Sequence, residues 1–416
     1  MQHIIIGNGP AGVVAAETLR KIDPQAGITL IGDEPEPPYS RMALPYLMMG
    51  NIPEAGTYLR KGERHFAGLG ITLLQDRVQG LDTAKRTVIC ASGQHLVYDR
   101  LLIATGSHPV TPPIPGLDLP GVHTCWTMAD ARSIIDRAAP GARVVQVGAG
   151  FIGCIIMEAL VSRGVQLTVV EMGDRMVPRM MTPVAGTMIR QWCEGRGVRV
   201  HVNTRVASIV RGQDGEALRV QLDSGDELPA DLLIVSAGVL PNVKFLDGSA
   251  VTCASGILVD AGMQTNVEGV YAAGDVAEAI DFSTGNRSLN AVQPNAVEQA
   301  RIAALNMAGR PVASRGSLAL NVLDTLGLIS SSFGKWWGDP AGETVELVDI
   351  EAYRYLSLQF QDDVLVGATA IGLTEHIGVL RGLIEGRVKL GEWKDRLLRE
   401  PMLVMDAYLA CAQAAA

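Results

Sequence analysis

Two glycine-rich runs carry the residue types and the spacing that suit phosphate binding. Residues 7–12 read Gly-Asn-Gly-Pro-Ala-Gly after the apolar run 3–6, and residues 148–153 read Gly-Ala-Gly-Phe-Ile-Gly after the apolar run 144–147. The first glycine of such a run allows a tight turn, the second lets the backbone approach a pyrophosphate, and the third lets helix and strand pack closely. The helix that follows presents unpaired N–H groups and the positive end of its dipole to the anion. The residues that we assign to nucleotide binding in these runs are Gly7, Gly9, Pro10, Ala11, Gly12, Gly148, Gly150, Phe151, Ile152 and Gly153.

Each run is followed by an acidic residue at the distance that suits ribose binding. Asp33, with Glu34 as the second candidate, follows the strand expected at 28–31, and Glu171 follows the strand expected at 167–170. A carboxylate there accepts hydrogen bonds from a free 2′-hydroxyl and repels a 2′-phosphate. Glu171 therefore favours NADH over NADPH, although Asp33 and Glu171 could also be ordinary solvated acids at strand ends. Two dinucleotide sites in one chain suggest hydride transfer from one dinucleotide to the other.

Composition narrows the class of protein. The net charge of −9 disfavours nucleic acid and anionic membrane surfaces as main partners. No run reaches the roughly 18 apolar residues of a membrane span, and a strand starting at residue 3 leaves no room for a signal peptide, so we expect a cytoplasmic protein. The cysteines form no C-x-x-C pair and show no metal-ligand spacing with histidines, so neither a disulfide framework nor a metal site is expected. The cysteines are Cys90, Cys125, Cys154, Cys193, Cys253 and Cys411.

The apolar runs indicate how the chain positions these residues. An apolar strand runs into a small-residue turn at 98–106, and the proline-rich stretch 109–120 is typical of a linker. A similar strand-and-turn signal ends the second unit at 232–238, and the strand pattern returns at 269–275. The first unit is thus interrupted by the second and completed after it. From about residue 318, β-branched and aromatic runs predict antiparallel strands in a separate α+β region.

With these motifs in place, the chain resembles the FAD- and NAD(P)H-dependent reductases of the pyridine nucleotide-disulfide oxidoreductase superfamily. The branch that it resembles contains NADH:rubredoxin and ferredoxin reductases and the FAD part of nitrite reductase. The resemblance implies two Rossmann-like three-layer α/β domains and a C-terminal α+β domain used for interfaces or dimerisation. The implied domains are an FAD domain of residues 1–113 and 244–317, an NAD domain of residues 114–243, and a C-terminal domain of residues 318–416. The motifs that carry the resemblance are the two glycine runs, Tyr98–Gly106, Gly269–Asp275, Pro294–Gly309, Leu365–Ala368, Leu380–Arg381 and Glu392–Lys394.

The resemblance also assigns roles by position. Asp275 would bind the ribitol or pyrophosphate region of FAD, and the helix opening at 294–296 would direct N–H groups at the flavin N1/O2 edge. Arg41 would pair with the pyrophosphate. Gly238 and Asn242 would lie near the nicotinamide cofactor or at the domain junction. The remaining residues assigned to cofactor binding are Val78, Ala104, Thr105, Gly106, Gly274, Pro294, Asn295 and Ala296.

Several positions depart from the pattern of the superfamily. Met42 stands where disulfide-reducing members carry a redox cysteine, and a thioether forms no thiolate, so cysteine chemistry is not expected. Tyr46 and Ile155 replace a lysine and a glutamate often found near the nicotinamide and flavin rings in ferredoxin reductases. Glu158 either substitutes for that glutamate or is a solvated acid. Gln293 replaces a tryptophan. No side chain is assigned to acid–base catalysis, because hydride transfer requires only that the two rings be stacked at the correct distance.

We therefore predict an FAD-dependent NADH reductase that passes electrons to a small redox protein similar to rubredoxin or ferredoxin. Two alternatives remain open. One is an NADH oxidase or a component similar to nitrite reductase, and the other is a non-catalytic NADH-responsive flavoprotein that binds a partner, as in relatives resembling apoptosis-inducing factor. Packing accounts for the pair Trp336–Trp337 better than a docking patch does. A homodimer contact or domain packing is expected for the apolar tail 402–416.

Overall fold

The computed structural model describes residues 1–62, 64–212 and 217–412, and these divide into two compact units. One unit comprises residues 1–47, 52–108 and 239–318, and the other comprises residues 48–51, 109–238 and 319–416. The second unit thus contains the region around the second glycine run together with the C-terminal region. In the part of the chain that the structure describes, no helix combines the length and the apolar character needed to cross a membrane.

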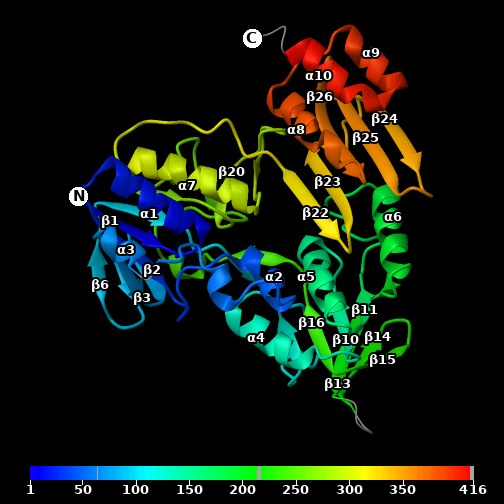
Figure 1. The fold of residues 1–416 in the computed structure, drawn as a ribbon. Coiled ribbons are helices and arrows are strands. Elements are labelled where there is room, and N and C mark those ends of the chain that lie inside the picture. The colour runs from blue at the N-terminus through cyan, green and yellow to red at the C-terminus, as the bar shows by residue number, and fades with distance from the viewer. Residues whose placement is uncertain (63, 213–216, 413–416) are drawn as a thin grey trace. The chain divides into compact units, whose positions relative to one another are not determined.

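The first unit is built on a five-stranded parallel sheet in the order β19–β7–β1–β2–β3. Its central strands are continuous apolar runs, as expected for strands covered on both faces. Two helices, α1 (Pro10–Ile22) and α7 (Gln293–Met307), lie side by side and pack against each other in Figure 1. The strands of this sheet are β1 (Gln2–Ile6), β2 (Gly27–Gly32), β3 (Ile71–Gln75), β7 (Arg100–Ile103) and β19 (Val270–Ala272).

Smaller elements surround this sheet. An antiparallel sheet consists of β4 (Val78–Asp82), β5 (Thr87–Cys90) and β6 (His95–Val97). A further small sheet has the order β18–β20–β21, and β8 pairs with β17. The bounds of the other elements are β8 (Ser107–Pro109), β17 (Val239–Pro241), β18 (Ile257–Leu258), β20 (Ala277–Ile280), β21 (Arg287–Ser288), α2 (Leu44–Met48), α3 (His65–Gly68) and the 3₁₀ turns Arg41–Ala43, Glu54–Thr57 and Lys244–Leu246.

The second unit repeats the same plan around the second glycine run. Its parallel sheet has the order β12–β11–β10–β16–β9, and an antiparallel sheet β13–β14–β15 packs beside it through shared apolar side chains. The strands are β9 (Val122–Thr124), β10 (Arg143–Val147), β11 (Gln166–Val170), β12 (Arg199–His201), β13 (Val206–Arg211), β14 (Leu218–Leu222), β15 (Glu227–Ala230) and β16 (Leu232–Val235). The helices are α4 (Met128–Arg137), α5 (Phe151–Ser162) and α6 (Pro183–Glu194).

The C-terminal region forms an antiparallel sheet in the order β22–β23–β26–β25–β24, as the β-branched and aromatic runs predict. Figure 1 shows helix α8 in orange and helices α9 and α10 in red beside this sheet. Strand β22 packs on α5. The Thr182 hydroxyl, at the start of α6, donates a hydrogen bond of 2.8 Å to the Tyr355 hydroxyl. The bounds are β22 (Leu320–Thr325), β23 (Leu328–Gly334), β24 (Glu343–Asp349), β25 (Arg354–Gln361), β26 (Val364–Ile371), α8 (Ile377–Glu385), α9 (Glu392–Arg399), α10 (Val404–Ala412) and the 3₁₀ turns Thr374–His376 and Pro401–Leu403.

The tryptophan pair and the tail lie in this region. Trp336 and Trp337 are in edge-to-face contact with ring centroids 5.6 Å apart, and the Trp337 side chain is exposed. In the tail, α10 packs on α8, with Val404 and Ala407 buried. Residues 413–416, which belong to the predicted tail and domain, lie outside the described residues.

Candidate functional site

The first glycine run forms a turn that only glycine can make at two of its positions. Gly7 has φ +106°, and a Cβ on it would fall 2.1 Å from the Ala104 carbonyl oxygen. A Cβ on Gly12 would fall 1.8 Å from the Gly7 carbonyl oxygen, so helix α1 and the turn pack without room for a side chain. A Cβ on Gly9 would meet nothing within 4 Å. No contact within the chain therefore requires a glycine at position 9. Such an open position is expected where the backbone approaches a ligand.

The second run has the same geometry. Gly148 has φ +99°, and a Cβ there would lie 2.5 Å from the Ser236 carbonyl oxygen. A Cβ on Gly153 would lie 2.6 Å from the Gly148 carbonyl oxygen, whereas one on Gly150 would meet nothing within 4 Å. Phe151 and Ile152 begin helix α5 directly after the open glycine. Both turns thus leave space at the same place in front of a helix.

The helix N-termini of the two nucleotide-binding regions differ in how they are capped. Thr127 and Asp130 form a reciprocal capping box on α4, and the Thr182 hydroxyl accepts from an N–H of α6. By contrast, α1, α5 and α7 begin without a side-chain cap and have no acidic residue in the first turn. A helix end without a side-chain cap leaves N–H groups for an anion. The three helices predicted to face FAD and NADH are therefore suited to do so.

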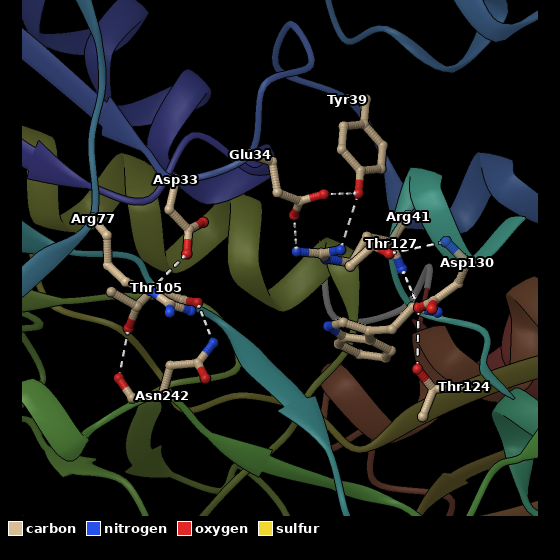
Figure 2. A network of polar contacts seen from close by, with 11 residues as sticks. Asp33, Glu34, Tyr39, Arg41, Arg77, Thr105, Thr124, Thr127, Asp130 and Asn242 are labelled. Atoms are coloured by element: carbon tan, nitrogen blue, oxygen red, sulfur yellow. Dashed lines mark hydrogen bonds and ion pairs between the residues drawn. The ribbon is translucent and has the colours of Figure 1, made fainter. Parts of the chain in front are cut away.

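The two acids after β2 occupy different environments (Figure 2). Asp33 lies 3.3 Å from the Arg77 guanidinium, and both side chains are exposed. Glu34 accepts from Arg41 at 2.6 Å and from the Tyr39 hydroxyl at 2.6 Å, and Arg41 also donates to that hydroxyl at 3.0 Å. The Glu34–Tyr39–Arg41 triad thus fixes the segment after β2. Val78 begins strand β4 next to Arg77.

Glu171 lies directly under the second glycine turn. Its side chain is only 7% exposed, and its two oxygens accept from the N–H groups of Ala149 and Gly173, each at 2.7 Å. Because the Ala149 N–H belongs to the turn itself, the carboxylate is positioned beside the open space at Gly150. Glu171 is therefore a buried hydrogen-bond acceptor held by two N–H groups. The alternative interpretation from the sequence, an ordinary solvated acid at a strand end, does not hold.

Strand register reveals a residue that sequence reasoning missed. Ile6 pairs with Ile31 in the first sheet, and Val147 pairs with Val170 in the second, so Gly32 occupies the position of Glu171. A Cβ on Gly32 would lie 2.2 Å from the Asn8 amide nitrogen. Asn8 itself occupies the position of Ala149 in the turn. The Asn8 amide thus fills the place where the second unit carries a carboxylate. Superposing the two glycine runs pairs Asn8 with Ala149, but only strand register pairs Gly32 with Glu171.

Asp275 is held below the end of β19 in the first unit. Its carboxylate accepts from the Ser107 hydroxyl at 2.9 Å. Burial raises the pKa of Asp275, against the opposing effects of the Ser107 hydrogen bond and the Arg41 charge. The neighbouring Gly274 has φ +83° and donates its N–H to the Gln299 side chain at 2.9 Å. Ser107 and Gln299 are partners that the sequence did not indicate.

Thr105 and Asn242 are hydrogen-bonded to each other within the first unit (Figure 2), and Gly106 joins them through its carbonyl group. The Asn242 amide nitrogen donates to the Thr105 carbonyl at 2.8 Å, and the Thr105 hydroxyl donates to the Asn242 carbonyl at 2.9 Å. The Asn242 N–H also donates to the Gly106 carbonyl at 3.0 Å. Asn242 thus joins the group predicted to line the FAD groove. Gly238, with φ +106°, lies in the second unit and accepts from the Val110 N–H.

The start of α7 is fastened to its surroundings by amide side chains. Asn295 is buried and donates to the Leu318 carbonyl at 3.2 Å, and Ala296 is buried beside it. The Ser40 hydroxyl donates to Gln293 at 3.0 Å. Pro294 occupies the first turn, where a missing N–H costs nothing. Hydrogen bonds of Asn295 and Gln293 thus hold the helix end, and Gln293 links it to the segment that carries Arg41.

None of the residues that depart from the superfamily pattern supplies a thiol. Met42 and Tyr46 are exposed, and burial, reinforced by nearby Asp324, raises the pKa of Glu158. All six cysteines are free, and burial raises the pKa of Cys125 and that of Cys193 to about 12. Such thiols remain protonated at neutral pH and are poor nucleophiles. Cys253 is exposed and Cys411 is partly exposed.

Comparison with known proteins identifies the family. Residues 1–304 match the family described as pyridine nucleotide-disulphide oxidoreductase. The chain belongs to this family. It is 33% identical over 97% of its length to the epsilon subunit of NADH-dependent phenylglyoxylate dehydrogenase from Aromatoleum evansii, covering 96% of that protein. It is 34% identical to the ferredoxin–NAD⁺ reductase component of the biphenyl dioxygenase system from Paraburkholderia xenovorans, covering 93% of each chain.

The fold matches as well. A putidaredoxin reductase–putidaredoxin complex superposes with a TM-score of 0.90 over 99% of each chain, and at 23% identity this likeness shows the fold alone. The predicted α/β fold with two Rossmann-like domains is confirmed. The chain is an FAD-dependent NAD(P)H oxidoreductase, with FAD and NADH as its cofactors. A bound FAD supplies a ring system that takes up two electrons as hydride and releases them singly.

Proposed function

We propose that this chain carries electrons from NADH through FAD to a small electron-transfer protein of the rubredoxin or ferredoxin class. The observation that carries the proposal is the repeated glycine turn, which leaves the same open space at Gly9 and at Gly150 before an uncapped helix. One chain with two such turns can hold two dinucleotides. The relatives named as ferredoxin–NAD⁺ and rubredoxin–NAD⁺ reductases support the direction of transfer.

FAD is assigned to the first unit. The residues that would hold it come from three places: the first glycine turn, the Glu34–Tyr39–Arg41 triad, and the start of α7. Asp275, fixed by Ser107, would accept hydrogen bonds from the ribitol hydroxyls. Arg41, already beside Glu34, would place positive charge near the pyrophosphate. Reduced flavin gathers negative charge at N1/O2, and the N–H groups that open α7 would stabilise it.

NADH is assigned to the second unit. The open space at Gly150 would admit its pyrophosphate, and Glu171 would accept from the adenosine ribose. Both Glu171 oxygens already accept hydrogen bonds from backbone N–H groups. Moving the carboxylate away from a 2′-phosphate would break these hydrogen bonds. This supports a preference for NADH over NADPH.

The acceptor is proposed to receive electrons without a thiol intermediate. Met42 supplies no thiolate at the position of the redox cysteine, and four of the six cysteines are buried. The likeness to the epsilon subunit of an NADH-dependent dehydrogenase favours a second candidate, in which the acceptor is a redox subunit bound permanently to this chain. We also propose a cytoplasmic location and a homodimer. The six free thiols support the cytoplasmic location, because reduced cysteines are typical of that compartment.

The acceptor is tested by reoxidation of the NADH-reduced protein. The purified protein is mixed anaerobically with NADH and then with a purified rubredoxin, a [2Fe–2S] ferredoxin, or buffer equilibrated with air. Reoxidation at least tenfold faster by one of the proteins than by air supports the proposal. Fastest reoxidation by air would assign an oxidase, and slow reoxidation by all three would direct the search to a permanent partner subunit.

A further inference from the structure

Gly274 lies where three elements of the first unit meet. It follows strand β19, and its φ of +83° turns the chain just beyond the end of that strand. A Cβ on Gly274 would lie 3.4 Å from the Cβ of Ala11 and 3.6 Å from that of Ala296. The turn therefore lies between the first turn of α1 and the first turn of α7, which are the two uncapped helices assigned to FAD. Asp275 is the next residue along the chain.

The N–H of Gly274 is held by a buried side chain of α7. Gln299 is only 4% exposed, and its side-chain oxygen accepts from the Gly274 N–H at 2.9 Å. Its side-chain nitrogen donates to the Ser317 hydroxyl at 3.1 Å. Because a backbone N–H can only donate, the amide must present its oxygen to Gly274 and its nitrogen to Ser317. One side chain in a single orientation thus ties the turn to α7.

Ser317 is held in place by its own backbone. Its N–H donates to the Ile280 carbonyl at 2.8 Å, at the end of β20, and its carbonyl accepts from the Phe282 N–H at 3.0 Å. The same carbonyl accepts from the Asn290 side chain at 3.0 Å. The Gln299 amide is therefore anchored on a group that is fixed independently of Gly274.

The order of these elements matches the order of chemical groups in FAD. The ribitol chain of FAD connects the pyrophosphate to the flavin ring. In the proposed assignment, α1 faces the pyrophosphate, Asp275 faces the ribitol and the start of α7 faces the flavin N1/O2 edge. The turn of Gly274 and Asp275 thus sets the spacing between two helix ends that serve opposite ends of one cofactor segment.

We propose that Gln299 is a positioning residue for FAD, which holds the turn of Gly274 and Asp275 between the starts of α1 and α7 without contacting the cofactor. The inference rests on the proposed assignment of FAD to the first unit. Without the amide, the turn and the start of α7 can shift relative to each other, so the affinity for FAD falls. The affinity for reduced FAD falls further, because its negative charge at N1/O2 requires correctly placed N–H groups.

The chain offers a matched control on the same helix. Asn306, in the last turn of α7, donates to the carbonyls of Gly262, Ile302 and Val312 at 2.8–3.1 Å. It also accepts from the Val312 N–H at 3.2 Å. Asn306→Ala therefore removes a comparable set of amide hydrogen bonds about two helical turns from Gln299 and leaves the Gly274 N–H paired.

The test compares Gln299→Met, Ser317→Ala and Asn306→Ala with the wild-type protein. Hydrogen exchange, followed by mass spectrometry, reports on peptides covering residues 270–280. Equilibrium dialysis of the FAD-free protein gives the Kd for FAD, and reductive titration against a dye of known potential gives the midpoint potential of the bound flavin. Methionine keeps the length of the side chain and removes both of its polar groups.

We expect Gln299→Met to exchange faster at 270–280 and to bind oxidised FAD about tenfold more weakly. Its midpoint potential should fall by about 30 mV, which is a further tenfold loss of affinity for the two-electron-reduced form. Ser317→Ala keeps the acceptor for Gly274 and should change all three quantities in the same direction by smaller amounts. Asn306→Ala should leave them unchanged.

Other outcomes separate the possible failures. Unchanged exchange at 270–280 in Gln299→Met, or equal changes in Asn306→Ala, would overturn the proposal. Weaker FAD binding at an unchanged potential would reduce Gln299 to a structural residue. Faster exchange with both the Kd and the potential unchanged would show that the contact holds the turn but that FAD is wrongly assigned to this unit. If Gln299→Met does not fold, Ser317→Ala decides the question by the same measurements.

Discussion

The two glycine turns, to which we assign FAD and NADH, have nearly the same backbone but carry different side chains at corresponding positions. In the second unit Glu171 supplies a carboxylate and Ala149 leaves room for it. In the first unit the corresponding position is Gly32, and the Asn8 amide occupies the space from the other side. The acid nearest to the first turn is shifted along the chain to Asp33 and Glu34.

This difference shows which part of a dinucleotide site is fixed by the fold and which part is free to specialise. The first and third glycines are fixed, because a side chain on either would collide with backbone. The sequence position of the acid can vary, because an acceptor for the ribose hydroxyls can be supplied from several positions at the end of the strand. A carboxylate locked by two N–H groups suits a site that must reject a 2′-phosphate, a demand that FAD does not make.

The largest effect should come from the third glycines. Gly12→Ala places a Cβ 1.8 Å from the Gly7 carbonyl oxygen, and Gly153→Ala places one 2.6 Å from that of Gly148. Because backbone atoms cannot move aside cheaply, we expect Gly12→Ala to lower the free energy of unfolding by about 3 kcal/mol. Gly153→Ala should cost less. Chemical denaturation followed by circular dichroism measures both, and equal losses would contradict the difference in packing between the turns.

The second glycines should affect ligands and not the fold. Gly9 and Gly150 have φ −72° and −74°, which alanine adopts freely, and a Cβ on either meets nothing in the chain. We expect Gly150→Ala to weaken NADH binding about tenfold or more with the FAD content unchanged, and Gly9→Ala to do the reverse. Flavin content per chain and NADH titration separate the two. Loss of FAD from Gly150→Ala would reverse the assignment of the units.

The locked acid should govern the choice of nucleotide. Glu171→Gln keeps the shape and removes the charge, and we expect the ratio of kcat/KM for NADH over NADPH to fall about tenfold. Glu34→Gln is the matched control in the first unit, because Glu34 is an acid at the end of the other corresponding strand. It should leave this ratio unchanged. An unaltered ratio in Glu171→Gln would show that the preference arises elsewhere.

Asn8 and Gly32 in the first unit occupy the positions of Ala149 and Glu171 in the second. A double-mutant cycle tests whether the side chains at positions 8 and 32 share one space. Gly32→Glu alone should be destabilising, because its Cβ would collide with the Asn8 amide. Asn8→Ala removes that amide, so the double variant should recover about 1–2 kcal/mol relative to the sum of the single changes. The free energies of unfolding of the four proteins measure the coupling. Strict additivity would mean that the two positions do not share one space.

The smallest effect concerns pH. Burial raises the pKa of Asp275 in the folded protein above that of the unfolded chain, so the stability of the FAD-free protein should fall as pH rises from about 4 through the raised value. Asp275→Asn cannot ionise and should remove this fall. Melting curves of both FAD-free proteins between pH 4 and 8 provide the comparison. The variant should meanwhile bind FAD about tenfold more weakly.

Much of this arrangement could be predicted from local sequence. The glycine spacing after apolar strands predicted both turns, and Glu171 was found by its distance from the second turn. Asn8 was missed because its role depends on Gly32, a relation visible only when strand register is known. Ser107 was missed because it meets Asp275 across 168 residues. Contacts of this kind depend on the packing of distant segments.

The most direct measurement is an anaerobic titration of the purified protein with NADH and, separately, with NADPH, following the visible flavin bands. We expect NADH to bleach the bands at one equivalent per flavin and NADPH to do so only at much higher concentration. Bleaching by NADH would establish that the two dinucleotides exchange hydride within this chain. A flavin spectrum that neither nucleotide bleaches would contradict that conclusion and favour a non-catalytic flavoprotein.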